Sequence, residues 1–291
     1  MGTKNVEKVI APSQPHFVGD GFRVHNFIPS AQGLSMQRMD PFIMLDYNSK
    51  FNFAPSDIPK GVGVHPHRGF ETVTIAYQGK IAHHDSSGGG GIIGEGDVQW
   101  MTAASGVLHK EYHEENFSKT GGLFQMVQLW VNLPAKDKMS TPKYQALDNK
   151  NINRYVLPDI GGEIEVIAGS YKGVKGSAST FSSINMLNAK LKEGTIADFS
   201  FPADFNTAVL VIEGSIFINE TIEVPTDNLA LLANEGENFT IEASENAIVL
   251  VLSGEPIKEP IANQGPFVMN TREELAQANS DFRAGKFGYL A

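Results

Sequence analysis

Hydrophobic residues along the chain occur mainly in short runs of the kind that form β-strands. Val, Ile, Phe, Tyr and Thr dominate these runs, and turn-forming residues such as Gly, Asn and Pro close them. Four of the clearest runs span residues 71–79, 122–134, 207–219 and 245–254. Because several such strands occur in each half of the chain, the pattern predicts an all-β protein built from β-sandwich or β-barrel domains.

One segment near the end of the chain, residues 271–285, carries the signals of a helix. Thr271 and Glu274 have the spacing of a capping box, in which each side chain bonds the other residue's backbone N–H. Gly285 stands where a helix commonly ends in the left-handed conformation. The sequence therefore predicts a C-terminal helix that packs on a β core.

The two halves of the chain resemble each other in the order of their features. Residues 71–88 and residues 207–223 share an apolar strand, a glycine turn and a second strand. Further along, residues 96–106 parallel residues 227–237 at the same relative place. This similarity predicts a β domain that has been duplicated.

The length of the chain agrees with a duplication, because 291 residues is about twice the usual domain size. The polar segment around 136–154 marks the boundary. We expect a first domain at 1–140 and a second at 150–291, the second ending in the helix.

Composition excludes several classes of protein. The chain has no Cys, which rules out disulfide frameworks, thiolate metal sites and cysteine nucleophiles. Its longest wholly apolar run, 247–252, is far short of the roughly 20 residues that a membrane-spanning helix needs. The first 15 residues lack the apolar core of a secretory signal. We therefore expect a cytoplasmic protein that does not bind membranes.

Charge and histidine are distributed very unevenly. Residues 1–150 carry 14 basic and 14 acidic side chains, whereas residues 151–291 carry 9 and 19 and so supply the whole net charge of -10. An acidic half repels phosphate backbones, which argues against direct binding of nucleic acid. All eight histidines lie between His16 and His113. Imidazole or metal chemistry is therefore expected only in the first half.

Two clusters in the first half have the residue types of a metal site. His65 and His67 are two residues apart, so on a strand both side chains point to one face. His109, Glu111 and His113 repeat the same spacing. Two such strands in one barrel would present several nitrogen and oxygen donors, a set that suits iron, manganese, nickel, copper or zinc.

These clusters belong to longer stretches that resemble the pirin family, which are bicupins of the cupin superfamily. The resembling stretches are 40–48, 65–74, 94–111, 129–139 and 265–274, and together they extend over most of the chain. The resemblance implies two cupin domains of β-sandwich or barrel form. It also implies one metal in the N-terminal barrel and none in the C-terminal barrel.

Carried over to this chain, the family pattern makes His65, His67, His109 and Glu111 the metal ligands, with Fe(II) as the metal and Zn, Ni, Mn or Cu as alternatives. Most cupins instead take their carboxylate ligand four residues after the second histidine, which is Glu71 here. Spacing alone does not choose between the two carboxylates. If Glu71 is not a ligand, we expect it to support the metal ligands from beside them or to be a structural acid, for example one paired with Arg68.

Several residues near these motifs have plainer interpretations. We expect His113 to be a channel or strand-end residue, with a hydrogen-bond donor beside the metal ligands or an extra ligand as alternatives. His83 and His84 are predicted to be exposed in a loop. The following glycines, 88–91, form a hairpin turn and not a phosphate loop, since no Lys and Ser or Thr follow them. Trp100, Met101 and Phe70 are expected to pack in the core, with an aromatic substrate pocket as the alternative.

The resemblance implies an activity as well as a site. Some pirins are flavonol 2,4-dioxygenases (quercetinases), so the first hypothesis is an oxidoreductase that cleaves a flavonol-like aromatic substrate with O₂ and releases carbon monoxide. In it, Glu111 serves both as ligand and as general base for the substrate hydroxyl. The alternative is an iron-dependent redox-sensing regulator whose partner is a transcription factor or a metabolic enzyme.

Overall fold

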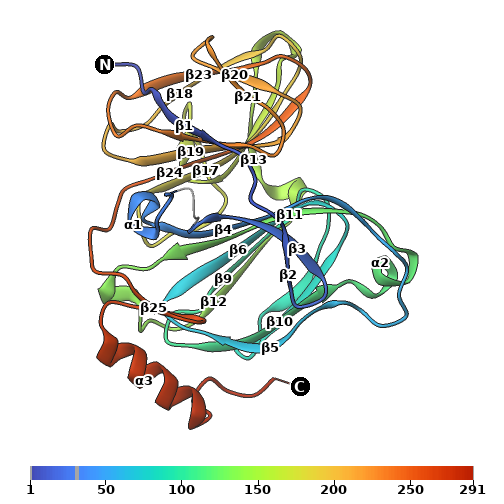
Figure 1. Ribbon diagram of the computed structural model, residues 1–291, viewed down its shortest axis with the longest axis vertical. Helices are drawn as coiled ribbons and strands as arrows, with labels where there is room; N and C mark the ends of the chain where they lie inside the picture. Colours follow the sequence, from blue (N-terminus) through green and yellow to red (C-terminus); the bar gives the residue numbers. More distant parts are fainter. Residues whose placement is uncertain (1, 30–32, 291) are drawn as a thin grey trace. The chain divides into compact units, whose positions relative to one another are not determined.

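The computed structural model describes residues 2–29 and 33–290, and strands make up most of it (Figure 1). The chain forms two compact units. The first, called the N-terminal unit, consists of Gln14–Gln37, Pro41–Asn149 and Ile257–Ala291. The second, the C-terminal unit, consists of Met1–Ser13, Arg38–Asp40 and Lys150–Pro256. The expected all-β class with a C-terminal helix is confirmed.

The N-terminal unit contains a large and a small antiparallel sheet. In order, the seven strands of the large sheet are β12 (Lys143–Leu147), β9 (Val98–Thr102), β6 (Phe70–Gln78), β11 (Gly122–Asn132), β4 (Phe42–Phe53), β3 (Phe22–Ile28) and β2 (His16–Val18). The small sheet has the order β5 (Gly61–His67), β10 (Val107–His113), β7 (Ile81–Asp85) and β8 (Gly90–Ile93). The β7–β8 hairpin is the predicted glycine turn.

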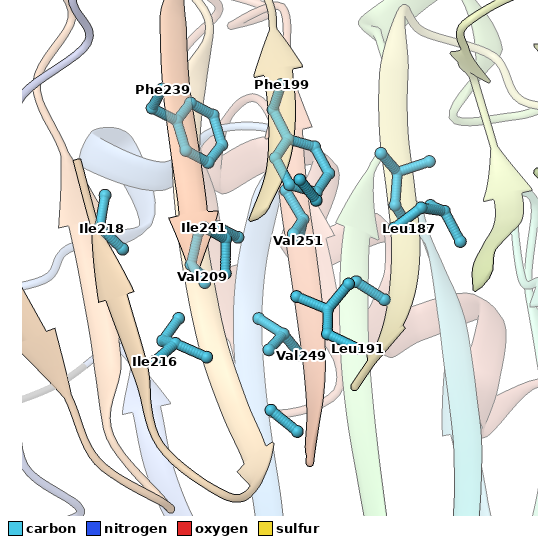
Figure 2. Close-up of a cluster of buried hydrophobic side chains, with 14 of the residues drawn as sticks. Leu187, Leu191, Phe199, Val209, Ile216, Ile218, Phe239, Ile241, Val249 and Val251 are labelled. Carbon is cyan, nitrogen blue, oxygen red and sulfur yellow. The ribbon is translucent and has the colours of Figure 1, made fainter. Parts of the chain in front are cut away.

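The C-terminal unit also contains a seven-stranded and a four-stranded sheet. The large sheet has the order β1 (Val6–Ile10), β22 (Leu229–Leu232), β19 (Asn206–Glu213), β24 (Ala247–Gly254), β17 (Ile184–Leu191), β14 (Gly162–Ala168) and β13 (Asn153–Val156). The small sheet has the order β18 (Ile196–Ser200), β23 (Asn238–Ala243), β20 (Ile216–Ile218) and β21 (Ile222–Val224). Apolar side chains from both sheets fill the space between them (Figure 2).

The two strand orders correspond position by position, in agreement with the predicted duplication. Strands β6 and β19 occupy the same place in their sheets, and each is followed by a glycine with positive φ, Gly79 or Gly214, five residues after Thr74 or Val209. The outermost strand beside β9 or β22 differs in origin, since β12 follows the other strands of its sheet in the sequence whereas β1 precedes those of its own sheet.

Shorter elements connect and flank the sheets. They are the α-helices α1 (Met36–Met39) and α2 (Glu115–Thr120), the 3-10 turns Ala135–Asp137, Asn149–Asn151 and Pro158–Ile160, and the hairpins β15–β16 (Ser170–Tyr171, Val174–Lys175) and β25–β26 (Ala262–Gln264, Phe267–Met269). Within the described residues, no helix is both long and apolar enough to cross a membrane.

The predicted C-terminal helix is confirmed as α3 (Arg272–Arg283). The Thr271 hydroxyl accepts a hydrogen bond from the Glu274 backbone N–H, and the Glu274 carboxylate accepts one from the Thr271 backbone N–H, so the capping box is complete. Leu275 and Ala278 are buried against β26. Gly285 takes the positive φ expected after the helix.

Both ends of the chain belong to a different unit from the one that the predicted ranges 1–140 and 150–291 give them. Strand β1 pairs with β22, so the first residues complete the sheet of the C-terminal unit. Helix α3 packs on β26, and Asp281 in this helix forms a buried ion pair with Arg68 at 2.8 Å. The β1–β22 pairing and the Arg68–Asp281 ion pair each join residues more than 200 positions apart. No short sequence pattern near either end of the chain predicts them.

Candidate metal centre

Two neighbouring strands of the small sheet bring three histidines together. His65 on β5 lies directly opposite His109 on β10, and His67 is two residues further along β5. One ligand nitrogen from each ring lies within 4.8 Å of the others. The ring centroids are 4.2 to 4.8 Å apart. The same-face spacing that predicted this cluster is therefore what assembles it.

In each of the three rings, Nδ1 already has a partner and Nε2 is left for a metal. His65 Nδ1 lies 2.8 Å from the Gly63 carbonyl oxygen, and His67 Nδ1 lies 3.4 Å from that of Pro266. Since carbonyl oxygens only accept hydrogen bonds, both Nδ1 atoms carry the proton. His109 Nε2 is buried and has no hydrogen-bond partner among the described residues. This is the usual orientation of metal-binding histidines, whose other nitrogen is held by a hydrogen bond.

The surroundings keep two of these rings neutral. Burial lowers the pKa of His67 and His109 well below the usual value, because it disfavours the charged form. The neighbouring imidazoles lower both pKa values further, His65 acting on His67 and both of these rings acting on His109. Neutral imidazole is the form that binds metals, so the cluster is ready for an ion at neutral pH.

Glu111 lies two residues beyond His109 on β10 and is buried. It belongs to a second possible ligand group, formed with His83 and His109, which overlaps the three-histidine group only at His109. The Gln128 side-chain amide on β11 contacts both carboxylate oxygens of Glu111, at 3.0 and 2.8 Å. Glu111 is thus held at the edge of the histidine cluster by a residue of the opposite sheet.

His83 is buried beside the cluster, and the prediction that it is exposed in a loop is wrong. Strand β7 continues through Asp85, and His83 lies directly opposite Glu111 on β10. His84 is opposite Lys110 and points to solvent, as predicted. Two adjacent histidines on a strand face opposite sides of the sheet. If residues 81–85 had been recognised as a strand, this rule would have predicted that one of the two histidines is buried.

His83 fixes the orientation of His109. The Gln99 amide nitrogen can only donate and lies 2.9 Å from His83 Nδ1, so this nitrogen is an acceptor, and His109 Nδ1 at 3.3 Å shares its one lone pair as a second donor. On its other side, His83 Nε2 lies 3.6 Å from Asp85 Oδ2. Although burial acts to raise it, the hydrogen-bonding partners of Asp85 hold its pKa at about 2, so the carboxylate is ionised. Asp85, His83 and His109 thus lie in a row of neighbouring polar side chains, and the row ends at the unpartnered Nε2 of His109.

The structure does not bring Glu71 to this cluster. Glu71 lies opposite Thr102, whose hydroxyl donates to it at 2.6 Å, on the face of the large sheet that points away from Gln128. The chain leaves the small sheet at Gly69, where φ is +91°, so the alternation that starts at His65 does not continue into β6. A side chain at Gly69 would also meet the Val268 carbonyl. Arg68 pairs with Asp281, and the expected pairing with Glu71 is wrong.

His113 is likewise buried away from the ligand groups. Its Nε2 donates to the Gly21 carbonyl at 2.8 Å. The rings of Phe53 and Phe124 pack against it, with centroids 4.6 and 4.9 Å away. Burial lowers its pKa. His113 is therefore packed among aromatic side chains of the core.

A cavity of about 450 Å³ opens beside the cluster. It reaches His65, His67 and Glu111, and its other walls are mainly apolar, formed by Val18, Phe22, Val24, Met44, Val62, Met126, Trp130 and Pro266 together with the polar Asp46 and Gln128. Trp100, Met101 and Phe70 are fully buried core residues that do not line it, as expected. Phe22 and Trp130 are its aromatic walls, and Trp130 is stacked on Phe70 with centroids 4.2 Å apart. Trp130 was missed, although it shares its strand face with Gln128.

The C-terminal unit places phenylalanines where the N-terminal unit has its three histidines. Phe199 on β18 lies opposite Phe239 on β23, as His65 lies opposite His109 (Figure 2). Phe201, two residues after Phe199, takes the place of His67. The three phenylalanine rings contact one another within the apolar core. The same framework therefore supports either an imidazole cluster or a hydrophobic core.

Comparison with known proteins places the chain in a defined group. Residues 21–131 match the family model described as Pirin, and residues 186–288 match that of the Pirin C-terminal cupin domain. A Pseudomonas aeruginosa protein named "Putative quercetin 2,3-dioxygenase PA2418" is 48% identical over 284 residues, 98% of each chain. A pirin-like protein of Caulobacter vibrioides is 36% identical and covers 99% of this chain and 100% of its own. The crystal structure of quercetin 2,3-dioxygenase from Acinetobacter baumannii superposes with a TM-score of 0.92, at 48% identity, over 99% of this chain and 100% of that one.

Proposed function

Because this chain belongs to the pirin family, as both family-model matches and its relatives show, we propose that it is a metal-dependent dioxygenase acting on flavonol-type aromatic substrates. The observation that carries the proposal is the position of the histidine cluster. His65 and His67 face an apolar cavity of about 450 Å³, which is within the size range of sites for small organic ligands.

The proposed metal ligands are His65, His67, His109 and Glu111, with Fe(II) as the physiological metal. Three imidazoles and one carboxylate suit iron, and they also accept Zn, Ni, Mn or Cu. Two observations support this set. His109 Nε2 has no hydrogen-bond partner among the described residues, and Nδ1 of His65 and of His67 is bonded to a backbone carbonyl, which leaves Nε2 of each ring for a metal. A bound ferrous ion would supply open coordination positions for an oxygen-bearing substrate and for O₂.

Glu111 is the proposed base for the hydroxyl group of the substrate. It lines the cavity, and the Gln128 amide holds its carboxylate from the opposite sheet. A buried carboxylate in this position accepts the hydroxyl proton as the substrate binds. The apolar walls, including Trp130 and Met126, surround the aromatic rings and keep bulk water from the reacting atoms.

The test is anaerobic reconstitution with Fe(II), followed by quercetin and O₂, with carbon monoxide and the loss of quercetin absorbance recorded together. We expect iron-dependent release of carbon monoxide that is lost in His109→Ala. His84→Ala is the matched control, because His84 is an exposed histidine on the adjacent strand, and it should react as the wild type does. Stoichiometric iron binding without turnover would contradict the dioxygenase proposal and favour the regulatory alternative.

A further inference from the structure

A row of five polar side chains crosses the large sheet of the N-terminal unit. These residues lie directly opposite one another on five neighbouring strands, and they are Gln99, Thr74, Gln128, Asp46 and Asn26. The row faces the small sheet, since Gln99 contacts His83 and Gln128 contacts Glu111. Polar groups in the interior of a barrel are costly unless they are satisfied, so the row needs an explanation.

The C-terminal unit shows that the fold itself does not require a polar row. The equivalent residues, counted from the glycines that end β6 and β19 and followed through the strand pairing, are Ala230, Val209, Val251, Leu187 and Val166. All five are buried in the apolar core, and Figure 2 shows Val209, Val251 and Leu187 packed there. The sheet can therefore form without the polar row, which is a feature of the N-terminal unit alone.

Two of the five polar residues are accounted for by the candidate metal centre. Gln99 holds His83, which in turn holds His109. Gln128 holds Glu111. Within the described part of the chain, Asp46 forms no such hydrogen bond with a candidate ligand, although it lines the same cavity as His65 and Glu111.

Asp46 is held in place from the side away from the cluster. The Asn26 amide nitrogen donates to Asp46 Oδ1 at 2.7 Å, and it also donates to the Ile28 carbonyl at 3.1 Å, which fixes the amide. On the cavity wall around it, Val24 and Met44 are apolar. Among the described residues that line the cavity there is no Lys or Arg to pair with the carboxylate.

Asp46 lies in a mostly apolar cavity wall, where its carboxyl group is available to a bound ligand. Burial raises the pKa of this carboxyl, against the opposing effects of the Asn26 amide and of His16. A carboxyl in a largely apolar cavity gains most from a ligand that brings a hydroxyl group to it, because water is displaced and the carboxyl keeps a hydrogen bond. An apolar residue such as the Leu187 of the other unit would make the cavity wall uniformly hydrophobic.

We propose that Asp46 determines specificity by binding a second hydroxyl group of the aromatic substrate, one that lies out of reach of Glu111. Asp46 is one strand further from the cluster than Gln128, and neighbouring strands are about 5 Å apart. A ligand that fills the cavity from Glu111 to Asp46 is therefore a polyhydroxylated aromatic molecule, not a singly hydroxylated one. This inference rests on the proposed function for its substrate class.

The experiment compares binding of quercetin and of 3-hydroxyflavone, which lacks the other hydroxyl groups, to metal-free and metal-loaded protein. Quenching of tryptophan fluorescence reports binding without any need for turnover. The wild type should bind quercetin about 10- to 100-fold more tightly, the ratio that a hydrogen bond to a charged group commonly gives. Asp46→Leu should remove this preference, and Asp46→Asn, which still accepts a hydrogen bond, should keep part of it.

Met44→Leu is the control variant, because it alters the same wall without touching a polar group and should change both affinities by the same factor. Circular dichroism checks that each variant is folded. An undiminished preference for quercetin in folded Asp46→Leu would overturn the inference. Failure of the dioxygenase proposal would appear separately, as absence of carbon monoxide from wild-type protein that still discriminates between the two ligands.

Discussion

The side-chain amide of Gln128 contacts both carboxylate oxygens of Glu111, joining the large sheet to the small sheet at the candidate metal centre. The residue equivalent to Gln128 in the C-terminal unit is Val251, and the residue equivalent to Glu111 is Ile241. Both lie in the apolar core of that unit (Figure 2). The polar pair has thus been placed within a framework whose other copy uses hydrophobic packing at the same points.

Substituting Gln128 tests whether this contact matters for the metal. In Gln128→Val, Glu111 loses the amide that orients it, so we expect metal affinity to fall about 10- to 100-fold, as is typical when the partner of a ligand is removed. Competition with a chromophoric chelator measures the affinity directly. Gln128→Glu places a like charge beside Glu111 and should weaken metal binding further. Unchanged affinity in both variants would show that Gln128 does not orient a metal ligand.

The chain from Asp85 through His83 to His109 gives a second prediction. His83→Leu removes the acceptor for His109 Nδ1, and we expect metal affinity to fall about 10- to 100-fold. His83→Gln, which can still accept this hydrogen bond, should have a metal affinity between those of His83→Leu and the wild type. His84→Leu is the matched control because this neighbouring histidine is exposed. Equal affinities in the position-83 and position-84 variants would contradict the role given to His83.

Glu71 gives a prediction about pH and stability. Burial raises the pKa of this carboxyl to about 7, against about 4.5 in the unfolded chain. Between these two values the folded protein binds more protons than the unfolded protein does, so stability must fall as pH rises. The expected loss is about 3 kcal/mol in total, since one pKa unit corresponds to about 1.4 kcal/mol.

Glu71→Gln removes this titration and keeps an acceptor for the Thr102 hydroxyl. Thermal unfolding of the two proteins from pH 5 to pH 8 should therefore show the wild type losing stability relative to the variant as pH increases. Parallel profiles over this range would mean that the carboxyl is not held protonated in the folded protein.

The three phenylalanines of the C-terminal unit suggest a direct test of the histidine cluster. The triple variant His65→Phe, His67→Phe and His109→Phe copies Phe199, Phe201 and Phe239 into the N-terminal unit. We expect it to fold, to bind no Fe(II) and to show no rise in unfolding temperature on metal addition. The wild type should become more stable with metal, because an ion that binds only the folded state stabilises it. Equal metal-induced stabilisation of both proteins would place the metal elsewhere.

The histidine cluster could be predicted because local alternation along the strands decides its geometry. His65, His67 and His109 lie within uninterrupted strands, so their spacing was enough to bring them to one face. Spacing alone could not separate Glu71 from Glu111, because the turn at Gly69 moves the chain to the other sheet and resets the alternation. His83 was misjudged because a glycine-rich turn after Asp85 made the end of a strand look like a loop.

Contacts between distant parts of the chain were beyond prediction from the sequence. The ion pair between Arg68 and Asp281 and the hydrogen bond from His67 to the Pro266 carbonyl both join the end of β5 to the C-terminal segment. Neither has a local pattern, because charges and carbonyl groups are common everywhere and only the folded chain selects the partners. The polar row containing Gln128 and Asp46 is similar, since its five members come from five separate strands.

The most direct test of the central claim is the rate of carbon monoxide release from quercetin and O₂, measured as a function of the iron bound per chain. The cluster at His65, His67 and His109 predicts a rate that rises in proportion to bound iron and stops rising at one ion per chain. Carbon monoxide release that is absent at full occupancy, or independent of occupancy, would contradict the assignment of this site as the centre of a dioxygenase.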